Sequence, residues 1–421
     1  MELRLDRLLA DLRRRTEAVL EAIDRDPLLL KRESGGLVLA NPSKELYTPQ
    51  QEHQLFAKGV VYRRAPYRLV SLPLVKIYNV GERDVTVADL ARLGAEPGTR
   101  LRFLRKIDGT LVQAFRADGR VWFTTRGMIE GAKLRAGQES GEARAAFDYL
   151  GTVRRLAAQR YPRLLEDESL LEEQTLVFEL IHPQAQQVTN YGDREDLVLL
   201  ACFDRRRCAY RPHEEVAALA LAHGLTAVDA LAPRGGSLAE QIDGLLAALA
   251  GTDQEGSVLT FERGGEVVYR VKVKSPDYLR LMRRMSECTY ERTAALLDAN
   301  PHLANWADLE AHLKALGREE APEEVLPFYR QHYDRHADYL AACERLRAWA
   351  ARECQALRAR LAGHDREGPA AYRKAFAALA KERPQPGLLF LALDGKLDLG
   401  RVRQVFPAPE QVREALRGLG G

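Results

Sequence analysis

The sequence predicts an α+β protein in which a strand-rich segment is followed by a purely helical one. Two hairpin signals lie in the first segment: Asp118-Gly119 separates LVQAF from RVWFTTR, and Gly264-Gly265 separates SVLTFER from EVVYRVKVK. Such dipeptides accept the positive φ values of a tight turn. After Ser275, apolar residues recur at three- and four-residue spacing, which is the helical period. We therefore expect two domains, 1–275 and 276–421.

Further elements of the first domain are expected on both sides of these hairpins. The N-terminal stretch 1–23 spaces its leucines at helical intervals and predicts one amphipathic helix packed on the body. Other strand candidates are TLVFELI, 188–191 and LVLLACFD, and helix candidates are 140–160, 213–224 and 238–250. Clustered hairpins with inserted helices differ from the strict strand–helix alternation of a doubly wound fold.

The second domain is expected to contain only helices. These are predicted over 276–298, 306–316, 323–362, 368–381 and about 408–418. Asn300-Pro301, Pro322 and Gly363 mark breaks between them. Acidic and basic side chains are nearly balanced in this part of the chain, so it is not a polybasic arm.

Composition narrows the class of protein. Of the 421 residues, 46% are hydrophobic and 29% are charged, which is enough apolar material for packed cores. A net charge of +3 is too small to attract a polyanion by itself, so nucleic acid would need a local groove. No apolar run reaches the roughly 18 residues of a bilayer span. Five scattered cysteines predict free buried thiols in a reducing compartment, and we expect the cytoplasm.

Four short motifs of the first domain carry charged residues at predicted strands. They are, in order, Lys106-Ile107-Asp108-Gly109, Phe178-Glu179, Glu255-Gly256 and Lys272-Val273-Lys274. Taken singly, each occurs by chance in unrelated proteins as a charged turn or a solvated strand. Their order and their common position at strands indicate a single site.

The motifs suit a lysine that acts as a nucleophile. At the ordinary lysine pKa of about 10.4, under about 0.1% of the side chain is neutral at pH 7. Lys272 and Lys274 alternate with Val273, so both point to one face of a strand. Two cations there can depress the pKa of a nearby amine and can also hold an anionic phosphate.

The carboxylates and glycines complete this chemistry. Glu179 and Glu255 sit in or beside apolar strands, where a carboxylate is costly unless it serves a cation or a sugar hydroxyl. Magnesium is commonly held by one or two carboxylates together with water. Gly109 and Gly256 lack side chains beside the charged residues, which lets the backbone approach a nucleotide closely.

As a set, these motifs resemble those of the covalent nucleotidyltransferases: DNA ligases, RNA ligases and mRNA capping enzymes. The wider context is most similar to the T-even phage type of tRNA-repair RNA ligase, over about residues 55–280. The segments that carry this resemblance are KGVVYR, RLVSLPLVKIYNVGE, RFLRKIDGTLVQAF, VWFTTRGMI, TLVFELIHPQAQQVTNYGDREDLVLLACFD and EGSVLTFERGGEVVYRVKVKSPDYL. The implied fold is a nucleotidyltransferase domain of ATP-grasp-like antiparallel sheets with flanking helices. The implied activity is ATP-dependent joining of 5′-phosphate and 3′-hydroxyl RNA ends, through lysyl-AMP and an adenylylated RNA 5′ end.

The resemblance also implies a role for each motif residue. Lys106 is expected to attack the α-phosphorus of ATP, expel pyrophosphate and carry AMP. Glu255 is expected to act with Lys272 and Lys274 in this step. A divalent metal ion, Mg²⁺ or Mn²⁺, is expected at Glu179 and Glu255. Nucleotide contacts are expected from Lys58, Lys76, Asp108, Gly109, Arg126, Phe178, Glu179, Lys272 and Lys274, with Tyr78 and Asn79 beside Lys76.

The chain departs from the family pattern at three places. Lys58 stands where the family usually has arginine, and the two are not interchangeable at a bidentate site. The segment ANPSK replaces a nucleotide-pocket tyrosine expected around position 41. Ile107 replaces an acidic residue and should matter little. The upstream nucleotide contact is therefore expected to differ from that of the family.

The helical second domain favours an RNA ligase over its relatives. DNA ligases and capping enzymes follow the K-x-K strand with an OB-fold, a run of short strands, whereas this chain turns helical after Ser275. A DNA ligase, a capping-type nucleotidyltransferase and a non-catalytic RNA-binding relative are the alternatives. The expected partner is RNA with 5′-phosphate and 3′-hydroxyl ends, with broken tRNA as a candidate recognised by the helical domain, and no membrane. The chain has no P-loop, so another protein would supply the end-healing kinase and phosphatase.

The second domain contains two histidines that lie close together in the sequence. His332 and His336 are four residues apart on a predicted helix, near Asp334 and Asp338. A metal site is one interpretation, and a solvated or RNA-facing helix surface is the favoured one.

Overall fold

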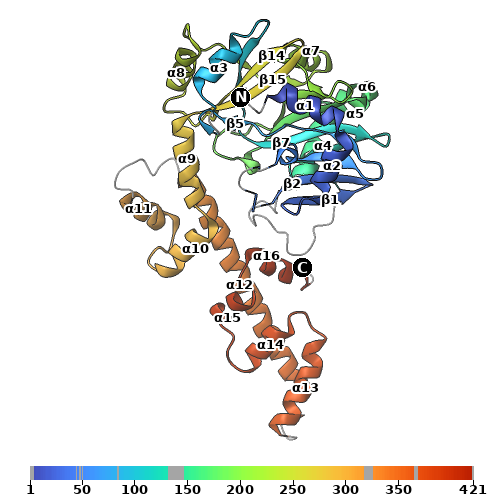
Figure 1. Ribbon diagram of the computed structural model, residues 1–421. Coiled ribbons are helices and arrows are strands. Elements are labelled where there is room, and N and C mark those ends of the chain that lie inside the picture. Colours follow the sequence, from blue (N-terminus) through green and yellow to red (C-terminus); the bar gives the residue numbers. More distant parts are fainter. Residues whose placement is uncertain are drawn as a thin grey trace. The chain divides into compact units, whose positions relative to one another are not determined.

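The computed structural model describes residues 4–43, 45–46, 49, 51–82, 85–130, 147–316, 326–364 and 368–419. The chain divides into two compact units, Met1–Met282 and Arg283–Gly421. The first is built from strands and helices and the second from helices (Figure 1). The predicted α+β class with a helical C-terminal region is confirmed.

Three sheets form the centre of the first unit. Sheet I has the order β1-β2-β3-β4, with β1 Leu29–Ser34, β2 Leu37–Pro42, β3 Val60–Arg63 and β4 Arg68–Ser71. Sheet II has the order β13-β6-β14-β15-β5, with β13 Ala230–Leu231, β6 Arg100–Lys106, β14 Gly256–Arg263, β15 Glu266–Lys274 and β5 Tyr78–Asn79. Sheet III has the order β11-β10-β9-β7-β8, with β11 Ala209–Tyr210, β10 Asp196–Asp204, β9 Gln174–Ile181, β7 Thr110–Ala117 and β8 Arg120–Thr125. Strand β12, Thr226–Ala227, lies beside β10 and parallel to it, and β5 is parallel to β15.

Two-residue turns make three of the antiparallel pairings. Gly35-Gly36 joins β1 to β2, Asp118-Gly119 joins β7 to β8, and Gly264-Gly265 joins β14 to β15. All six turn residues have positive φ, between 51° and 76°. Two successive positive φ values define the type I′ turn, whose twist matches that of the strands. The two predicted hairpins are confirmed.

Helices cover the outer faces of sheets II and III. On sheet II, α3 Val87–Gly94 and α8 Leu238–Ala248 bury Leu90, Leu93, Ile242 and Leu245 against Phe103, Leu259 and Phe261. Thr86 and Ser237 begin these two helices with capping boxes. On sheet III lie α4 Tyr149–Arg160, α5 Arg163–Glu166, α6 Glu168–Glu172 and α7 His213–His223. The helices predicted at 213–224 and 238–250 are confirmed as α7 and α8.

The N-terminal region differs from the expected single helix. Two helices are present, α1 Leu5–Arg14 and α2 Thr16–Arg25. Arg15 has φ −125° and ψ 31°, which breaks the helix between them. The break lets the leucines of α1 pack with Val19, Leu20 and Ile23 of α2 into one core with sheet I.

Two other predicted elements of this unit are a helix and a strand. The helix expected over 140–160 is present as α4, and its first part lies outside the described residues. The strand expected at 188–191 is wrong. The backbone N–H groups of Val188 and Thr189 donate to a carboxylate oxygen of Asp108, so they are not free for a strand ladder.

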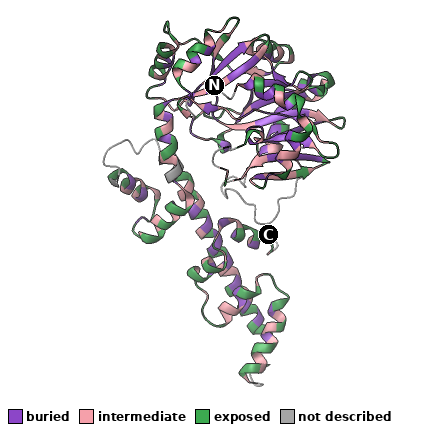
Figure 2. Ribbon diagram, in the orientation of Figure 1, coloured by how far each residue is buried: buried purple, intermediate pink, exposed green. Residues whose placement is uncertain are grey.

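One long helix organises the second unit. Helix α12, Leu326–Arg360, buries one stripe made of Tyr339, Cys343, Leu346, Ala350, Cys354 and Leu357, at spacings of three and four residues (Figure 2). Packed around it are α10 Tyr290–Ala299, α11 Trp306–Leu316, α13 Pro369–Lys381, α14 Pro386–Leu393, α15 Leu399–Val405 and α16 Pro409–Arg417. Helix α9, Pro276–Glu287, runs from the first unit into the second.

Most predicted helices of this unit are present. The helix expected over 276–298 is interrupted at Cys288 and Thr289, where the Thr289 side chain caps the start of α10. Residues 323–325 of the expected helix over 323–362 lie outside the described part. The sequence did not predict α14 and α15, which are short.

The two histidines of α12 pack inside the second unit. Nε2 of His332 lies 2.9 Å from the carbonyl oxygen of Cys288, and Nδ1 of His336 lies 3.3 Å from the Tyr290 hydroxyl. His336 is only 3% exposed. The favoured interpretation of a solvated or RNA-facing surface is therefore wrong for His336, which packs between α12 and α10. His332 is half-buried and contacts the backbone between α9 and α10.

All five cysteines are free and buried, as predicted. In the ranges that the structure describes, helices with the length and apolarity of a membrane span are absent.

Candidate active site

Lys106 stands at the end of β6, and the three residues after it carry the chain from sheet II to sheet III. Gly109 lies against β9, because a Cβ at this position would be 2.4 Å from the carbonyl oxygen of Leu180. No side chain fits at that distance, so the crossing requires glycine. The close contact fixes the backbone directly after Lys106.

Asp108 is buried and anchors this crossing to two other segments. Its Oδ2 accepts hydrogen bonds from the backbone N–H groups of Val188 (2.8 Å) and Thr189 (2.9 Å). Its Oδ1 accepts one from the Tyr278 hydroxyl of α9 at 3.0 Å, and its backbone N–H donates to the Tyr191 hydroxyl at 3.0 Å. Protein donors thus occupy both carboxylate oxygens of Asp108. The hydrogen bond to Tyr278 connects the segment after Lys106 to α9.

Strand register places Lys106 and Lys274 on opposite sides of Gly256. In sheet II, Gly256 of β14 pairs with Lys106 of β6 and with Lys274 of β15. The φ of Gly256 is 138°, and a Cβ there would lie 2.0 Å from the carbonyl oxygen of Val273. The close approach of β14 to β15 at this row therefore depends on glycine.

The carboxylate of Glu255 bridges the two lysines of this row. Its Oε2 lies 2.5 Å from Nζ of Lys106, and its Oε1 lies 2.8 Å from Nζ of Lys274. The Glu255 side chain is 4% exposed and each lysine side chain 19%. Both carboxylate oxygens are engaged, so each lysine is held in a defined position at the edge of sheet II.

Lys272 is a further cation on β15, beside Lys274. It lies two residues before Lys274 and therefore on the same face of the strand. Burial, followed by the charges of Lys106, Lys274 and Lys76, lowers its pKa to about 8. Within the described ranges, Lys272 has no acidic ion-pair partner, so it is a cation available to an anionic ligand.

Lys58 and Lys76 reach the same region from other parts of the chain. Lys76 precedes β5 and pairs with Glu82 at 3.4 Å. Burial lowers the pKa of Lys58 to about 7, with contributions from Lys76, Lys272 and Arg126. Because the charges of Lys76 and Lys272 act on Lys58, sheets I and II contribute to one cationic cluster.

The backbone after Lys58 is fixed from three sides. Gly59 has a φ of 98°, and a Cβ there would lie 3.2 Å from Cα of Arg126. Its N–H donates to the Ala40 carbonyl at 2.9 Å, and its carbonyl accepts from Nε2 of Gln113 at 2.5 Å. These contacts place Lys58 beside Arg126 at the end of β8.

Gln113 is the middle of a buried hydrogen-bond chain that spans sheets I and III. Its Oε1 accepts from the Ser71 hydroxyl at 2.6 Å, and Ser71 shares a second hydrogen bond with the Thr175 hydroxyl at 2.9 Å. Gln113 is 1% exposed and the other two are fully buried. This series of hydrogen bonds ends at the Gly59 carbonyl, so it links the core of sheet III to the position of Lys58.

Replacement of Gln113 by leucine tests this link. The Gly59 carbonyl and the Ser71 hydroxyl would be left buried without their partner, so the free energy of unfolding is expected to fall by about 1–3 kcal/mol. Denaturant unfolding measures it, with the exposed Gln159→Leu as a control that should stay within about 0.5 kcal/mol of the original chain. A Gln113→Leu variant as stable as the control would contradict the assignment.

Glu179 faces the lysines from sheet III. Burial, opposed by the charges of Lys106 and Lys272 and reinforced by the neighbouring carboxylates of Glu255 and Asp108, raises its pKa to about 8 and is the largest cause. Among the described residues, its carboxylate has no hydrogen-bond or ion-pair partner. A group in this situation gains from the arrival of a cation.

The structure brings most of the predicted site residues together. Electrostatic contacts, ion pairs or backbone contacts connect Lys58, Lys76, Lys106, Asp108, Gly109, Arg126, Glu179, Glu255, Lys272 and Lys274. Phe178 is not among them. It is fully buried on the opposite face of β9 from Glu179, in the core beneath α4 and α7.

Three residues of the site were not predicted from the sequence. Tyr278 holds Asp108 and lies with its ring 5.3 Å from Nζ of Lys274, Gln113 fixes Gly59, and Glu82 pairs with Lys76. A glutamine inside the apolar strand LVQAF was a signal that a buried polar contact exists there. Tyr278 has a weaker signal, its position in the first turn of the helix that follows Lys274.

Comparisons with known proteins give a mixed result. No protein-family model matches the sequence, and no curated protein is significantly similar to it. Among solved structures, the chain is similar to an archaeal ATP-dependent RNA ligase, with 15% identity over 77% of this chain and 78% of that one and a TM-score of 0.40. It is also similar to a putative ATP-dependent DNA ligase from Aquifex aeolicus, with 14% identity over 76% and 72% of the chains and a TM-score of 0.42. An RNA ligase of Naegleria gruberi with PPi gives 17% identity, 50% and 57% coverage and a TM-score of 0.34.

Proposed function

We propose that this chain is an ATP-dependent RNA ligase that joins 5′-phosphate and 3′-hydroxyl ends. The observation that carries the proposal is the bridge from Lys106 through Glu255 to Lys274, with Lys58, Lys76 and Lys272 gathered around it. Five lysines that converge at the end of a K-x-D-G strand form a site for a polyphosphate. One of them, Lys106, is held by a carboxylate that can also accept a proton.

In the proposed first step, Nζ of Lys106 attacks the α-phosphorus of ATP. A phosphorus–nitrogen bond forms, the bond from the α-phosphorus to the bridging oxygen breaks, and pyrophosphate leaves. Lys106 must lose a proton in this step, and Oε2 of Glu255 at 2.5 Å is placed to accept it. Lys272 and Lys274 neutralise charge on the phosphates, which is the usual task of cations in phosphoryl transfer.

A divalent metal ion fits this site at Glu179. Its carboxylate has no protein partner in the described part of the chain, whereas both oxygens of Glu255 are engaged by lysines. The described residues hold no group of three or more metal-binding side chains, so most other ligands would come from phosphate and water. Bound Mg²⁺ or Mn²⁺ would supply positive charge beside the phosphates.

In the later steps, AMP passes to an RNA 5′-phosphate, and a 3′-hydroxyl attacks that phosphate and releases AMP. We infer RNA as the substrate because, among the described residues after Lys274, only helices are present. A DNA ligase or capping-type enzyme would use a run of strands there. Broken tRNA is a candidate substrate for the helical unit, and end healing would fall to another protein. The buried free thiols fit a reducing compartment, and we propose the cytoplasm.

The pH dependence of ATP binding follows from two lysines. The pKa of Lys58 is lowered to about 7 and that of Lys272 to about 8, mainly by burial. Their protonated forms bind phosphate, so ATP affinity is expected to be full below about pH 7 and to decline as the pH rises through both values. Arginine stays protonated, so Lys58→Arg should lose the first decline.

Titration of ATP binding from about pH 6 to about pH 9 measures this effect. The exposed Lys381→Arg serves as the control and should follow the unmodified chain. Identical pH profiles for Lys58→Arg and the unmodified chain would argue against a phosphate contact by Lys58.

A panel of end-labelled oligonucleotides tests the proposed function itself. With ATP and Mg²⁺, we expect joining of 5′-phosphorylated RNA to a 3′-hydroxyl RNA end, and little joining of the matching DNA. Preferential joining of nicked DNA would support the DNA ligase alternative. Binding of RNA without any joining or adenylylation would support the non-catalytic one.

A further inference from the structure

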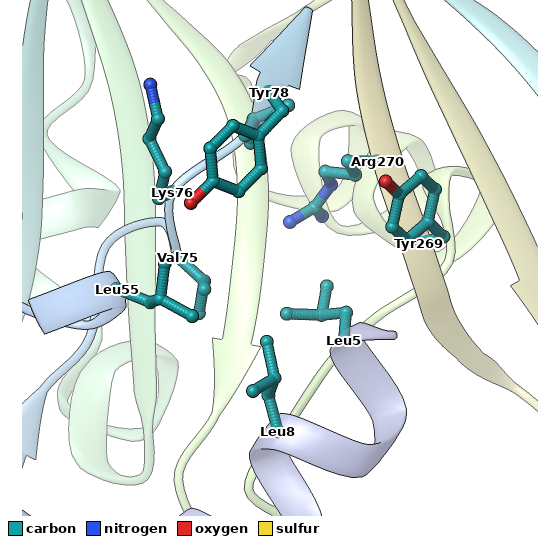
Figure 3. Close-up of a pocket in the computed structure, with 9 residues that line it drawn as sticks. Leu5, Leu8, Leu55, Val75, Lys76, Tyr78, Tyr269 and Arg270 are labelled. Carbon is teal, nitrogen blue, oxygen red and sulfur yellow. The ribbon is translucent and has the colours of Figure 1, made fainter. Parts of the chain in front are cut away.

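A pocket lies beside the lysine cluster, between α1 and the strands β5 and β15. Its apolar walls come from Leu5, Leu8, Leu55 and Val75, and its charged side chains are Lys76 and Arg270 (Figure 3). The described side chains that line it include two cations and no carboxylate. Lys76 has its counter-charge in Glu82, which does not line the pocket, whereas Arg270 has no ion pair among the described residues. An apolar pocket that contains such a cation favours an anionic ligand.

Arg270 is the cation of this pocket whose N–H donors have no acceptor among the described residues. It lies two residues before Lys272 on β15 and therefore on the same face of the strand as the cations of the site. Its guanidinium stacks on the Tyr210 ring, 4.4 Å from the centroid. No carboxylate or hydrogen-bond acceptor among the described residues meets its five N–H donors. Figure 3 shows the guanidinium directed into the space between Tyr78 and Leu5.

Burial makes this arrangement costly without an anion. Tyr210 beneath the guanidinium is fully buried, and burial lowers the pKa of Arg270. Buried polar groups in proteins are almost always hydrogen-bonded, so a partly buried guanidinium with no partner requires an explanation. A planar fork of N–H donors matches the oxygens of a phosphate group.

We propose that this pocket is an oxyanion site that binds a phosphate group through the guanidinium of Arg270, with Lys76 at its rim. Lys76 also connects the pocket to the cluster, because its charge acts on both Lys58 and Lys272. Same-face residues on a strand are about 6.6 Å apart, so Arg270, Lys272 and Lys274 form a line of cations. Such a line suits a ligand with several successive phosphates.

Two sources could supply this phosphate, and both rest on the proposed function. One is pyrophosphate, released when Lys106 is adenylylated. The other is the phosphodiester backbone of the RNA strand. The chemistry at Arg270 is the same for both, so binding experiments must distinguish them.

The test uses the full chain without ATP, so that it does not depend on ligase activity. Arg270→Met removes the charge and keeps an unbranched side chain, and the exposed Arg68→Met is the matched control for net charge. Affinities for inorganic pyrophosphate and for a 5′-phosphorylated RNA are measured by calorimetry and by fluorescence anisotropy. We expect Arg270→Met to weaken one of them at least about tenfold, the loss of one charged hydrogen-bonding group, and Arg68→Met to change neither.

The pattern of losses identifies the source. Weaker pyrophosphate binding alone assigns the pocket to the leaving group, and weaker RNA binding alone assigns it to the backbone. Unchanged binding of both ligands by a folded Arg270→Met variant overturns the proposal.

A second measurement on the unmodified chain covers the case in which Arg270→Met does not fold. Crystals of the full chain are soaked in tungstate, a heavy oxyanion of phosphate-like shape. Anomalous density beside the Arg270 guanidinium is expected, and its absence there overturns the proposal. If the chain proved not to be a ligase, the tungstate result and the pyrophosphate affinity would still stand.

Discussion

Replacement of Lys106 by methionine is expected to abolish ATP-dependent RNA joining, lowering the rate by roughly 10⁴-fold or more, as the loss of a nucleophile does in other enzymes. Methionine is similar in length but has no amine, so no bond to the α-phosphorus can form. Lys106 is also the residue that Glu255 holds at 2.5 Å, at the end of the strand that crosses to sheet III. A gel assay with 5′-labelled RNA and ATP measures the rate.

Two controls separate lost chemistry from lost structure. The exposed Lys381→Met, on α13, should join RNA at the original rate. Lys106→Met should still seal an RNA that already carries AMP on its 5′ end, because that step needs no lysyl-AMP. Joining from ATP at more than about a tenth of the original rate would exclude Lys106 as the nucleophile.

Replacement of Glu255 by glutamine is expected to lower the rate of adenylylation by roughly 10²–10³-fold, comparable to the removal of one key electrostatic contact in other active sites. Glutamine keeps the shape of the side chain but removes the charge that holds Lys106 and Lys274. Two neighbouring ammonium groups would then lack their shared counter-charge. The free energy of unfolding should also fall, by roughly 1–3 kcal/mol.

Glu262→Gln is the matched control for this prediction. Glu262 lies on β14, the strand that begins directly after Glu255. Its side chain is also about 4% exposed, and it accepts a hydrogen bond from the backbone N–H of His213. Its loss should cost stability but change adenylylation by less than about threefold, since it lies outside the lysine cluster. Equal loss of adenylylation in both variants would mean that Glu255 acts only through general stability.

Local sequence patterns predicted much of the fold. Asp118-Gly119 and Gly264-Gly265 identified two hairpins because the positive φ values of a type I′ turn restrict the residue types. The helical period identified α7, α8 and most of the second unit. The prediction of a strand at 188–191 was wrong for a nonlocal reason. Asp108, which is distant in the sequence, accepts hydrogen bonds from the backbone N–H groups of this segment.

The site could be predicted only in part for the same reason. Lys106, Glu255 and Lys274 were expected together, but the row that joins them at Gly256 depends on strand register, which the motifs do not contain. Phe178 was expected near the nucleotide because it adjoins Glu179, yet neighbours on a strand face opposite ways. Gln113 and Tyr278 act through contacts between distant segments, and single-sequence patterns give no such pairs.

The most direct test of the account is the covalent bond to Lys106. The unmodified chain is incubated with ATP labelled at the α-phosphate and with Mg²⁺, then denatured, digested and mapped by mass spectrometry. We predict a labelled AMP adduct on the peptide that contains Lys106, and no adduct on Lys106→Met. An adduct on another lysine, or none on either protein, would contradict the account.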